Sequence, residues 1–225
     1  MTFTHLTVGT SKLPSKPPRS NPPCTEPYVK GANILRDPGF ELHLSNTGKT
    51  EIPELSSSWA TLTWQDTTTP DPSLIGWANT AYVAGGSVTA WDISDAGEET
   101  GSYSARMVGN TLAPHLAVIG LVGCSDGEFY SARCEPGDYT RVACRGIVDS
   151  TSGTPNVLIA MEWYAADGSF IDSADLADTP LTTSYATYET DGFAPATSYY
   201  MRVYYKVSNQ SGRTIYLDNA VLEVS

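Results

Sequence analysis

A two-residue alternation, in which every second side chain is apolar, is the feature that most limits how this chain can fold. It is clearest in Val157–Tyr164 and Tyr199–Val207. Successive side chains of a strand point to opposite faces, so each stretch predicts a strand that buries one face. The predicted core faces are Val157, Ile159, Met161 and Trp163 in the first stretch and Tyr199, Met201, Val203, Tyr205 and Val207 in the second.

Turn sequences separate these strands from their neighbours. Asp167-Gly168 is a typical two-residue hairpin loop. Glu135-Pro136-Gly137-Asp138 is a turn sequence before a strand at Tyr139–Val148. Further strands are predicted at Gly101–Val108, Leu116–Val122, Phe129–Cys134 and Thr214–Val224. No stretch has sustained helical periodicity, so we expect an all-β fold, an antiparallel β-sandwich.

The first 32 residues have a different composition. They hold six of the fifteen prolines, most of them between Leu13 and Pro23. Such a run favours an extended polyproline II conformation and cannot join a central strand. The loose alternation of Thr2–Val8 offers an edge strand to another chain. We therefore expect an extended Pro-rich arm over residues 1–32 and one β-sandwich domain over residues 33–225.

The charge is divided along the same boundary. The formal net charge of the chain is -12, whereas residues 1–36 carry five bases and one acid, which leaves -16 on residues 37–225. An acidic body excludes nucleic-acid binding through the general surface. A basic arm on an acidic body favours docking on an acidic protein surface, such as a neighbouring copy, and a solvated tail is the open alternative.

The N-terminus shows no signal peptide, because residues 1–5 have neither a basic start nor an apolar segment. The longest apolar run, near Leu116–Gly123, is far too short to cross a bilayer. We expect a soluble protein without a membrane partner, which either stays in the cytoplasm or leaves it without a Sec signal.

The four cysteines are Cys24, Cys124, Cys134 and Cys144. None forms a CxxC pair, and their spacing does not match a zinc site. If residues 134 and 144 lay on a simple hairpin about Glu135–Asp138, Cys134 would face Tyr139 rather than Cys144. Disulfides remain open, and the favoured interpretation is reduced, buried cysteines that act as small apolar side chains.

Catalytic motifs are missing from the sequence. His5, His43 and His115 are isolated, and neither an HExxH motif nor a G-x-S-x-G motif is present. A glycosidase pair of carboxylates remains open because acids are plentiful. We expect a protein that is not an enzyme and has no catalytic residues.

Four of the five tryptophans lie in one irregular segment, at positions 59, 64, 77 and 91. They could form aromatic platforms for sugar rings. The favoured interpretation is that they fill the ends of the sandwich core, because Trp is highly buried on average.

The order of four motifs resembles the carbohydrate-binding-module 4/9/22 type of jelly roll. Asn33–Glu41 resembles its N-P-G-F-E opening, with Asp37 where Asn is usual, and we expect Gly39 to supply a positive φ there. Gly101–Arg106 resembles its G-x-x-S-x-R strand, and Glu135–Thr140 its p-G-x-x-Y turn. Tyr216–Leu222 resembles the closing Y-x-D-D-V-x-L strand. The resemblance covers residues 33–225.

This resemblance implies a possible structural calcium ion, the only cofactor expected here. In the family, the ion lies between the opening Glu, backbone oxygens near the G-x-x-S strand and the closing Asp. The matching positions are Glu41, Gly101 and Asp218, and Asn219 departs from the pattern because it replaces a second Asp. Hard oxygen donors suit Ca²⁺, and hydrogen-bonded carboxylates without a metal are the open alternative.

A ligand-binding face is predicted by parity alone. Tyr164, Tyr200, Arg202 and Tyr204 lie on the polar side of the two alternating stretches. Aromatic rings and Arg suit sugars, and they are equally enriched in protein–protein contacts. A merely solvated face is the third alternative.

The same resemblance indicates a function. Jelly rolls of this kind recur in secreted glycosidases and in bacteriophage virion proteins. An unsecreted copy with a Pro-rich arm is similar to minor tail or head-decoration proteins. We expect a virion structural protein that docks on other virion proteins through residues 1–32, is oligomeric in the assembly, and displays the jelly roll towards host surface glycan. The alternative is a stand-alone carbohydrate-binding module of a cell-wall or polysaccharide-acting system.

Overall fold

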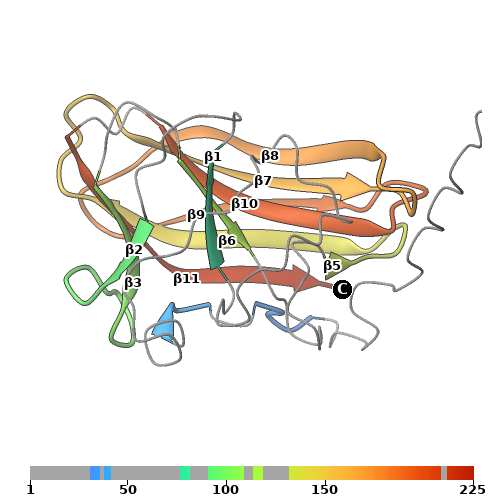
Figure 1. Cartoon of the computed structure of the whole chain (residues 1–225), viewed down its shortest axis with the longest axis horizontal. Helices are drawn as coiled ribbons and strands as arrows, with labels where there is room; N and C mark the ends of the chain where they lie inside the picture. The colour runs from blue at the N-terminus through green and yellow to red at the C-terminus, as the bar shows by residue number, and fades with distance from the viewer. Residues whose placement is uncertain are drawn as a thin grey trace, which may run out of the picture.

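The chain folds into two antiparallel β-sheets packed face to face. The computed structural model describes residues 31–35, 38–41, 77–81, 91–108, 114–118, 132–208 and 212–225. Figure 1 shows β8, β7 and β10 in one layer, with β6 and β11 in the layer below. The predicted all-β sandwich is confirmed, and the described elements from Trp77 to Val224 are all strands.

One layer, sheet B, holds six strands in the order β1-β4-β10-β7-β8, with β5 pairing to β10 beside β4. Their bounds are Trp77–Ala81 (β1), Pro114–Val118 (β4), Ala132–Arg133 (β5), Asn156–Tyr164 (β7), Phe170–Pro180 (β8) and Tyr200–Ser208 (β10). The longest register joins β10 to β7 along their whole lengths. Sheet B is therefore centred on the two stretches whose alternation is strongest.

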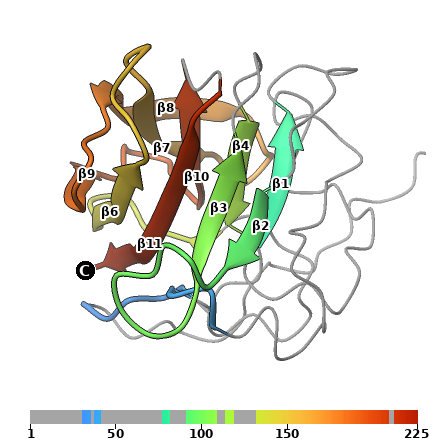
Figure 2. The same cartoon turned by 90° about the vertical axis from the view of Figure 1, so that its left-hand side faces the viewer.

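The other layer, sheet A, holds five strands in the order β2-β3-β11-β6-β9. Their bounds are Trp91–Ser94 (β2), Ser104–Val108 (β3), Tyr139–Val148 (β6), Ala186–Phe193 (β9) and Thr214–Val224 (β11). Figure 2 shows the short strands β1 to β4 gathered on one side of the sandwich and β6, β8 and β9 on the other. The edge strands β8 and β9 thus lie on the same side.

The core lies between the sheets and follows the predicted alternation. The buried residues of β7 and β10 that face the core are Val157, Ile159, Met161, Trp163, Met201, Val203, Tyr205 and Val207. Tyr205 also donates a hydrogen bond from its hydroxyl to the Ala143 carbonyl of β6, 3.0 Å away, which joins the two sheets. Tyr199 was predicted to continue this face, but it precedes β10 and is only partly buried.

Aromatic side chains fill one part of this core. Phe40 is buried, and its ring stacks on Trp77 with centroids 4.6 Å apart. Trp91 is also fully buried. The interpretation of the tryptophans as core residues is therefore confirmed for Trp77 and Trp91, whereas Trp59 and Trp64 lie outside the described residues.

The N-terminal turn departs from the prediction for Gly39. The left-handed residue is Phe40, with φ of 60°, and Gly39 is not among the residues with positive φ. A bulky residue adopts this conformation only when its surroundings hold it there. Burial of the Phe40 ring against Trp77 is that constraint, so a tertiary contact overrides the local preference.

Several strand boundaries also differ. Gly101 lies in the loop before β3, which begins at Ser104. β4 begins at Pro114 rather than Leu116, and residues 119–131 lie outside the described chain. The predicted strand after the Asp167-Gly168 turn is confirmed and extends to Pro180.

The simple-hairpin arrangement of residues 134 and 144 does not occur. The turn at Glu135–Asp138 is present, but β5 pairs with β10 and β6 belongs to the other sheet. Cys134 and Cys144 are both buried and reduced, as expected, and burial raises the pKa of the Cys134 thiol to about 12. Cys24 and Cys124 lie outside the described residues.

The arm predicted over residues 1–32 is described only at its end. Gly31 donates from its backbone N–H to the Val224 carbonyl, 2.8 Å away, so the described chain begins beside the C-terminal strand. Within the part of the chain that the structure describes, no helix has the length and apolar character needed to span a membrane.

Candidate functional sites

The outer face of sheet B brings together the predicted ligand-binding residues of β7 and β10. The register pairs Arg202 with Glu162 and Tyr200 with Tyr164. Tyr204 lies two residues further along β10 on the same face, paired with Ala160. The predicted shared face is therefore confirmed for Tyr164, Arg202 and Tyr204. The side chain of Tyr200 is outside what the structure describes.

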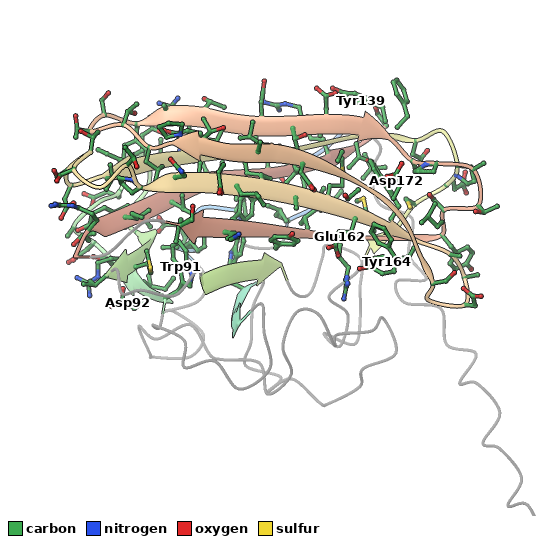
Figure 3. The ribbon with its side chains drawn as sticks, turned by 90° about the horizontal axis from the view of Figure 1, so that it is seen from above. Trp91, Asp92, Tyr139, Glu162, Tyr164 and Asp172 are labelled. Carbon is green, nitrogen blue, oxygen red and sulfur yellow. The ribbon has the colours of Figure 1, made fainter. Side chains whose placement is uncertain are left out.

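Arg202, Glu162 and Tyr164 form one polar cluster on this face. The Arg202 guanidinium donates to Glu162 Oε2 at 3.1 Å and lies over the Tyr164 ring, 4.4 Å from its centroid. It also bonds to the Tyr164 hydroxyl, which donates to Glu162 Oε2 at 2.6 Å. Figure 3 shows Glu162 and Tyr164 together at the end of the sheet where Asp172 also lies. A cation–π contact and a charge-assisted pair thus fix the Arg202 head group.

The cluster is more buried than a solvated sheet face would be. Arg202 and Tyr204 are only 6% and 9% exposed, although they point away from the core. Burial raises the pKa of Tyr164 above its ordinary value. Loss of one partner of a buried ion pair costs about 3–5 kcal/mol, so Arg202 and Glu162 support the sheet as well as the face.

The chemistry of this face is mixed. Tyr164 offers an aromatic ring beside a guanidinium, and Glu162 offers acceptor oxygens. Asp175 of β8 lies close enough for the charge of Glu162 to help burial raise its pKa. Such a set can stack on the apolar side of a ring and exchange hydrogen bonds with hydroxyl groups.

The second predicted site, at Glu41, Gly101 and Asp218, is also brought together. Glu41 Oε1 accepts from the backbone N–H groups of Ser102 and Tyr103, at 2.7 and 2.9 Å. A Cβ atom added to Gly101 would lie 2.3 Å from the same Oε1, so only glycine fits beside the carboxylate. The backbone of the loop between β2 and β3 therefore packs closely around the Glu41 carboxylate.

Asp218 holds the same loop from β11. Its Oδ2 accepts from the N–H groups of Glu99 and Thr100, at 3.0 and 3.2 Å, and its Oδ1 accepts from Asn219 at 2.6 Å. Asp218 is fully buried, and burial raises the pKa of its carboxyl despite these three bonds. A neighbouring positive charge would favour the ionised form.

The donor chemistry of this site fits a calcium ion in part. Glu41 and Asp218 supply carboxylate oxygens to one loop, and Gly101 leaves room for a close approach of the backbone. Further ligands would be carbonyl oxygens, which Ca²⁺ accepts readily. Among the residues that the structure describes, no group of three His, Cys, Asp or Glu side chains is arranged to hold a metal.

Several residues of these sites were not predicted. Arg145 of β6 bonds to Glu99 in the loop and lowers the pKa of that carboxyl. The Tyr185 hydroxyl bonds to the Gly97 carbonyl. Parity could have added Glu162 to the ligand face, because it shares a side of β7 with Tyr164. No sequence pattern could have identified Arg145 and Tyr185, because their partners Glu99 and Gly97 are far away in the sequence.

Comparisons with known proteins show similarity only in the arrangement of the strands. No protein-family model and no curated protein match the sequence. Among solved structures, the enzymatically active domain of bacteriophage CBA120 tailspike protein 4 is 16% identical with a TM-score of 0.49; the match covers 67% of this chain and 19% of that one. This chain therefore spans about a fifth of the tailspike structure.

Two carbohydrate-binding modules are also similar to this chain. TmCBM61, solved in complex with β-1,4-galactotriose, is 16% identical with a TM-score of 0.47, over 87% of this chain and 100% of that one. The CBM22-1 xylan-binding domain of Paenibacillus barcinonensis Xyn10C is 14% identical with a TM-score of 0.43, over 72% of this chain and 90% of that one. These similarities concern the arrangement of strands in the sandwich.

Proposed function

We propose that this chain is a non-catalytic carbohydrate-binding protein that holds a glycan against the outer face of sheet B. The observation that supports this most is the Arg202 guanidinium, which is fixed by Glu162 over the Tyr164 ring on the outward side of the sheet. An aromatic ring beside fixed hydrogen-bond donors and acceptors suits a sugar ring and its hydroxyl groups.

The proposal is tested with a glycan array followed by calorimetric titration of the full chain with β-1,4-galactotriose and xylohexaose. Tyr164→Ala removes the ring and is expected to weaken binding at least tenfold. Phe193→Ala is the matched control, because Phe193 is 68% exposed on the opposite sheet. An array without any signal for the unchanged protein would remove the sugar proposal.

A second candidate function is a structural role in a bacteriophage particle, as a minor tail or capsid-decoration protein. It is favoured by the net positive charge of residues 1–36 beside a body of charge -16. The arm would dock on other virion proteins, and the sandwich would be displayed outward. This role is tested by locating the chain in purified particles, and its absence from them would exclude the role without affecting sugar binding.

A calcium ion at Glu41 and Asp218, with backbone carbonyls near Gly101, is proposed as the cofactor. It would supply positive charge to a buried carboxylate whose pKa is raised. Its role would be structural, because it would tie the loop between β2 and β3 to both ends of the domain.

A further inference from the structure

A large apolar ring faces the solvent at the start of β8. Among the described residues, the large apolar side chains that are exposed are Val108, Phe170 and Phe193, and Phe170 is 57% exposed. Single exposed apolar residues are normal on a protein surface, so exposure by itself assigns Phe170 no role. The position of Phe170 beside the polar cluster of sheet B is what distinguishes it.

Phe170 lies on the same face as this cluster. The register pairs it with Tyr164, and directly opposite residues of neighbouring strands share a face. The two rings meet edge to face, with centroids 5.8 Å apart and an interplanar angle of 75°. The Arg202 guanidinium lies over the Tyr164 ring, 4.4 Å from its centroid. Tyr164 therefore contacts both Arg202 and Phe170, and the freely exposed ring of the pair is Phe170.

A bulge in β8 turns Phe170 towards this face. Trp163 pairs with Asp172 and Tyr164 pairs with Phe170, so Ile171 is an extra residue without a partner on β7. In a regular ladder, Ile171 would lie opposite Tyr164, and Phe170 would point to the core side. Bulges re-aim side chains in this way and are common next to binding and active sites. The bulge thus exposes a ring that a regular strand would direct towards the core.

The hairpin between β7 and β8 holds the ring in place. The backbone N–H groups of Ala165 and Gly168 donate to the carbonyls of Ser169 and Ala165, both at 2.9 Å. Asp167 Oδ1 accepts from the hydroxyl and the N–H of Ser169, at 2.7 and 3.0 Å, and these bonds lower the pKa of Asp167. Ser169 directly precedes Phe170. A ring on such a hairpin loses little conformational freedom when a ligand binds.

The charges of this face favour an uncharged ligand. Arg202 is already paired with Glu162, 3.1 Å away. Ser173 lies opposite Glu162, and Asp175 follows two residues later on the same face. None of the ion pairs among the described residues involves Asp175. Residues 37–225 carry a formal charge of -16 in total. A ligand with carboxylates of its own would be repelled, so a neutral sugar is favoured.

We propose that Phe170 is the ring on which a neutral sugar stacks, and that Tyr164 is the positioning residue that fixes Phe170 and Arg202. The assignment rests on the function proposed above and names the contact residue and the class of glycan. A pyranose ring presents C–H groups on one side and hydroxyl groups at its rim. It can therefore lie on Phe170 while its hydroxyl groups exchange hydrogen bonds with the polar cluster.

The experiment is calorimetric titration of the full chain with β-1,4-galactotriose and xylohexaose. Phe170→Leu keeps an apolar side chain but removes the ring, so the affinity should fall at least about fivefold, whereas Phe170→Tyr restores the ring and should bind within about twofold of the unchanged protein. Phe193→Leu is the matched control and should bind unchanged. Phe193 is likewise exposed beside a tyrosine ring, that of Tyr139 at 5.4 Å, but on sheet A.

A tryptophan at the same position gives a readout that a purely structural role would not move. In Phe170→Trp, the emission of the new indole should shift to shorter wavelength on saturation with xylohexaose, because a stacked sugar excludes water from it. Phe193→Trp should show no shift. Sedimentation of Phe170→Leu should match that of the unchanged protein. A change in oligomeric state would assign Phe170 to a protein contact and overturn the proposal.

The class of glycan is tested with cellohexaose and hexaglucuronate, which share the ring and the β-1,4 linkage and differ in the C6 carboxylates. The uronate should bind more weakly at low salt, and tighter binding of the uronate would overturn the neutral class. If the unchanged protein binds a glycan and Phe170→Leu binds it equally well, the assignment of Phe170 is wrong and the proposed function stands. If the unchanged protein binds no glycan, both are wrong.

Discussion

At the scale of single residues, the loop site combines unusual backbone angles with buried charge. Phe40 and Asn219 have φ of 60° and 48°, and they flank Glu41 and Asp218 respectively. Asn adopts this region readily, whereas Phe does so at a cost of about 1–3 kcal/mol. The turn therefore depends on the packing of Phe40 against Trp77 and not on its own sequence.

Gly101 is the residue whose replacement tests this site most directly. Gly101→Ala should lower the free energy of unfolding by about 2–4 kcal/mol, because its φ is positive and the new Cβ would collide with Glu41. Gly137→Ala is the control, since Gly137 also has positive φ but no atom within 4 Å of the added Cβ. It should cost about 1 kcal/mol. Urea unfolding measures both, and equal losses would mean that the Glu41 contact does not constrain the loop.

At the scale of elements, β11 is the strand on which separate segments converge. β3 and β6 pair with its two edges, and a register shift between Asp218 and Val221 interrupts the pairing with β6. Asn33 bridges to Glu223 and donates to the Ala220 carbonyl at 2.9 Å. The loop between β2 and β3 is held by Asp218 from β11 and by Arg145 from β6. These contacts explain why the loop is ordered around a carboxylate.

The pair of Arg145 and Glu99 predicts a pH-dependent contribution to stability. Arg145 holds the pKa of Glu99 below its ordinary value of 4.5. A depressed acid stabilises the folded state above its unfolded pKa, and this contribution is lost as the pH falls through the lowered pKa. Arg145→Gln should therefore cost up to about 1 kcal/mol at pH 7, because the pair is partly exposed, and the difference should close as the pH falls through the lowered pKa of Glu99.

Arg141→Gln is the matched control for this measurement. Arg141 lies on β6 like Arg145, but its partners, Glu189 and Glu223, lie outside the loop between β2 and β3. Hydrogen exchange at the Glu99 and Thr100 amides should rise in the Arg145 variant alone. Equal exchange in both variants would contradict the assignment of Arg145 to the loop.

At the scale of the whole molecule, the two ends of the domain meet. The segment that begins at Gly31 runs along β11 and lies beside the C-terminal residues (Figure 1). Glu41 comes from the start of the domain and Asp218 from its last strand. A ligand held by both carboxylates would oppose separation of the ends, so its effect should appear in global unfolding.

The proposed calcium ion is tested by thermal unfolding. A ligand present at 100 times its dissociation constant stabilises the folded state by about 2.7 kcal/mol. For a domain of this size, the melting temperature should then rise by about 5–10 °C with CaCl₂ relative to EDTA. Glu41→Gln should remove this shift, and Glu135→Gln should keep it. Identical melting temperatures in CaCl₂ and EDTA would exclude the site.

Alternation and turn chemistry were sufficient to predict the spans of β6 and β11, and to predict β7 and most of β10 with their core faces, because these strands each bury one side. The same parity placed Tyr164, Arg202 and Tyr204 on one face. Parity did not predict that Arg202 and Tyr204 are buried, because it gives the face to which a side chain points and not how exposed that face is. Turn chemistry failed for Gly39, because the left-handed residue is determined by a contact between Phe40 and Trp77.

The sequence by itself determined the all-β class, the alternating faces, the turn at Asp167-Gly168 and the charge contrast between the arm and the body. These properties depend on neighbouring residues and on backbone chemistry. Only the tertiary structure decided that Arg145 and Asp218 hold one loop, that Arg202 is fixed over Tyr164, and that β8 is an edge strand of its sheet. Each of these depends on which strands become neighbours, and that choice is made by packing across the whole chain.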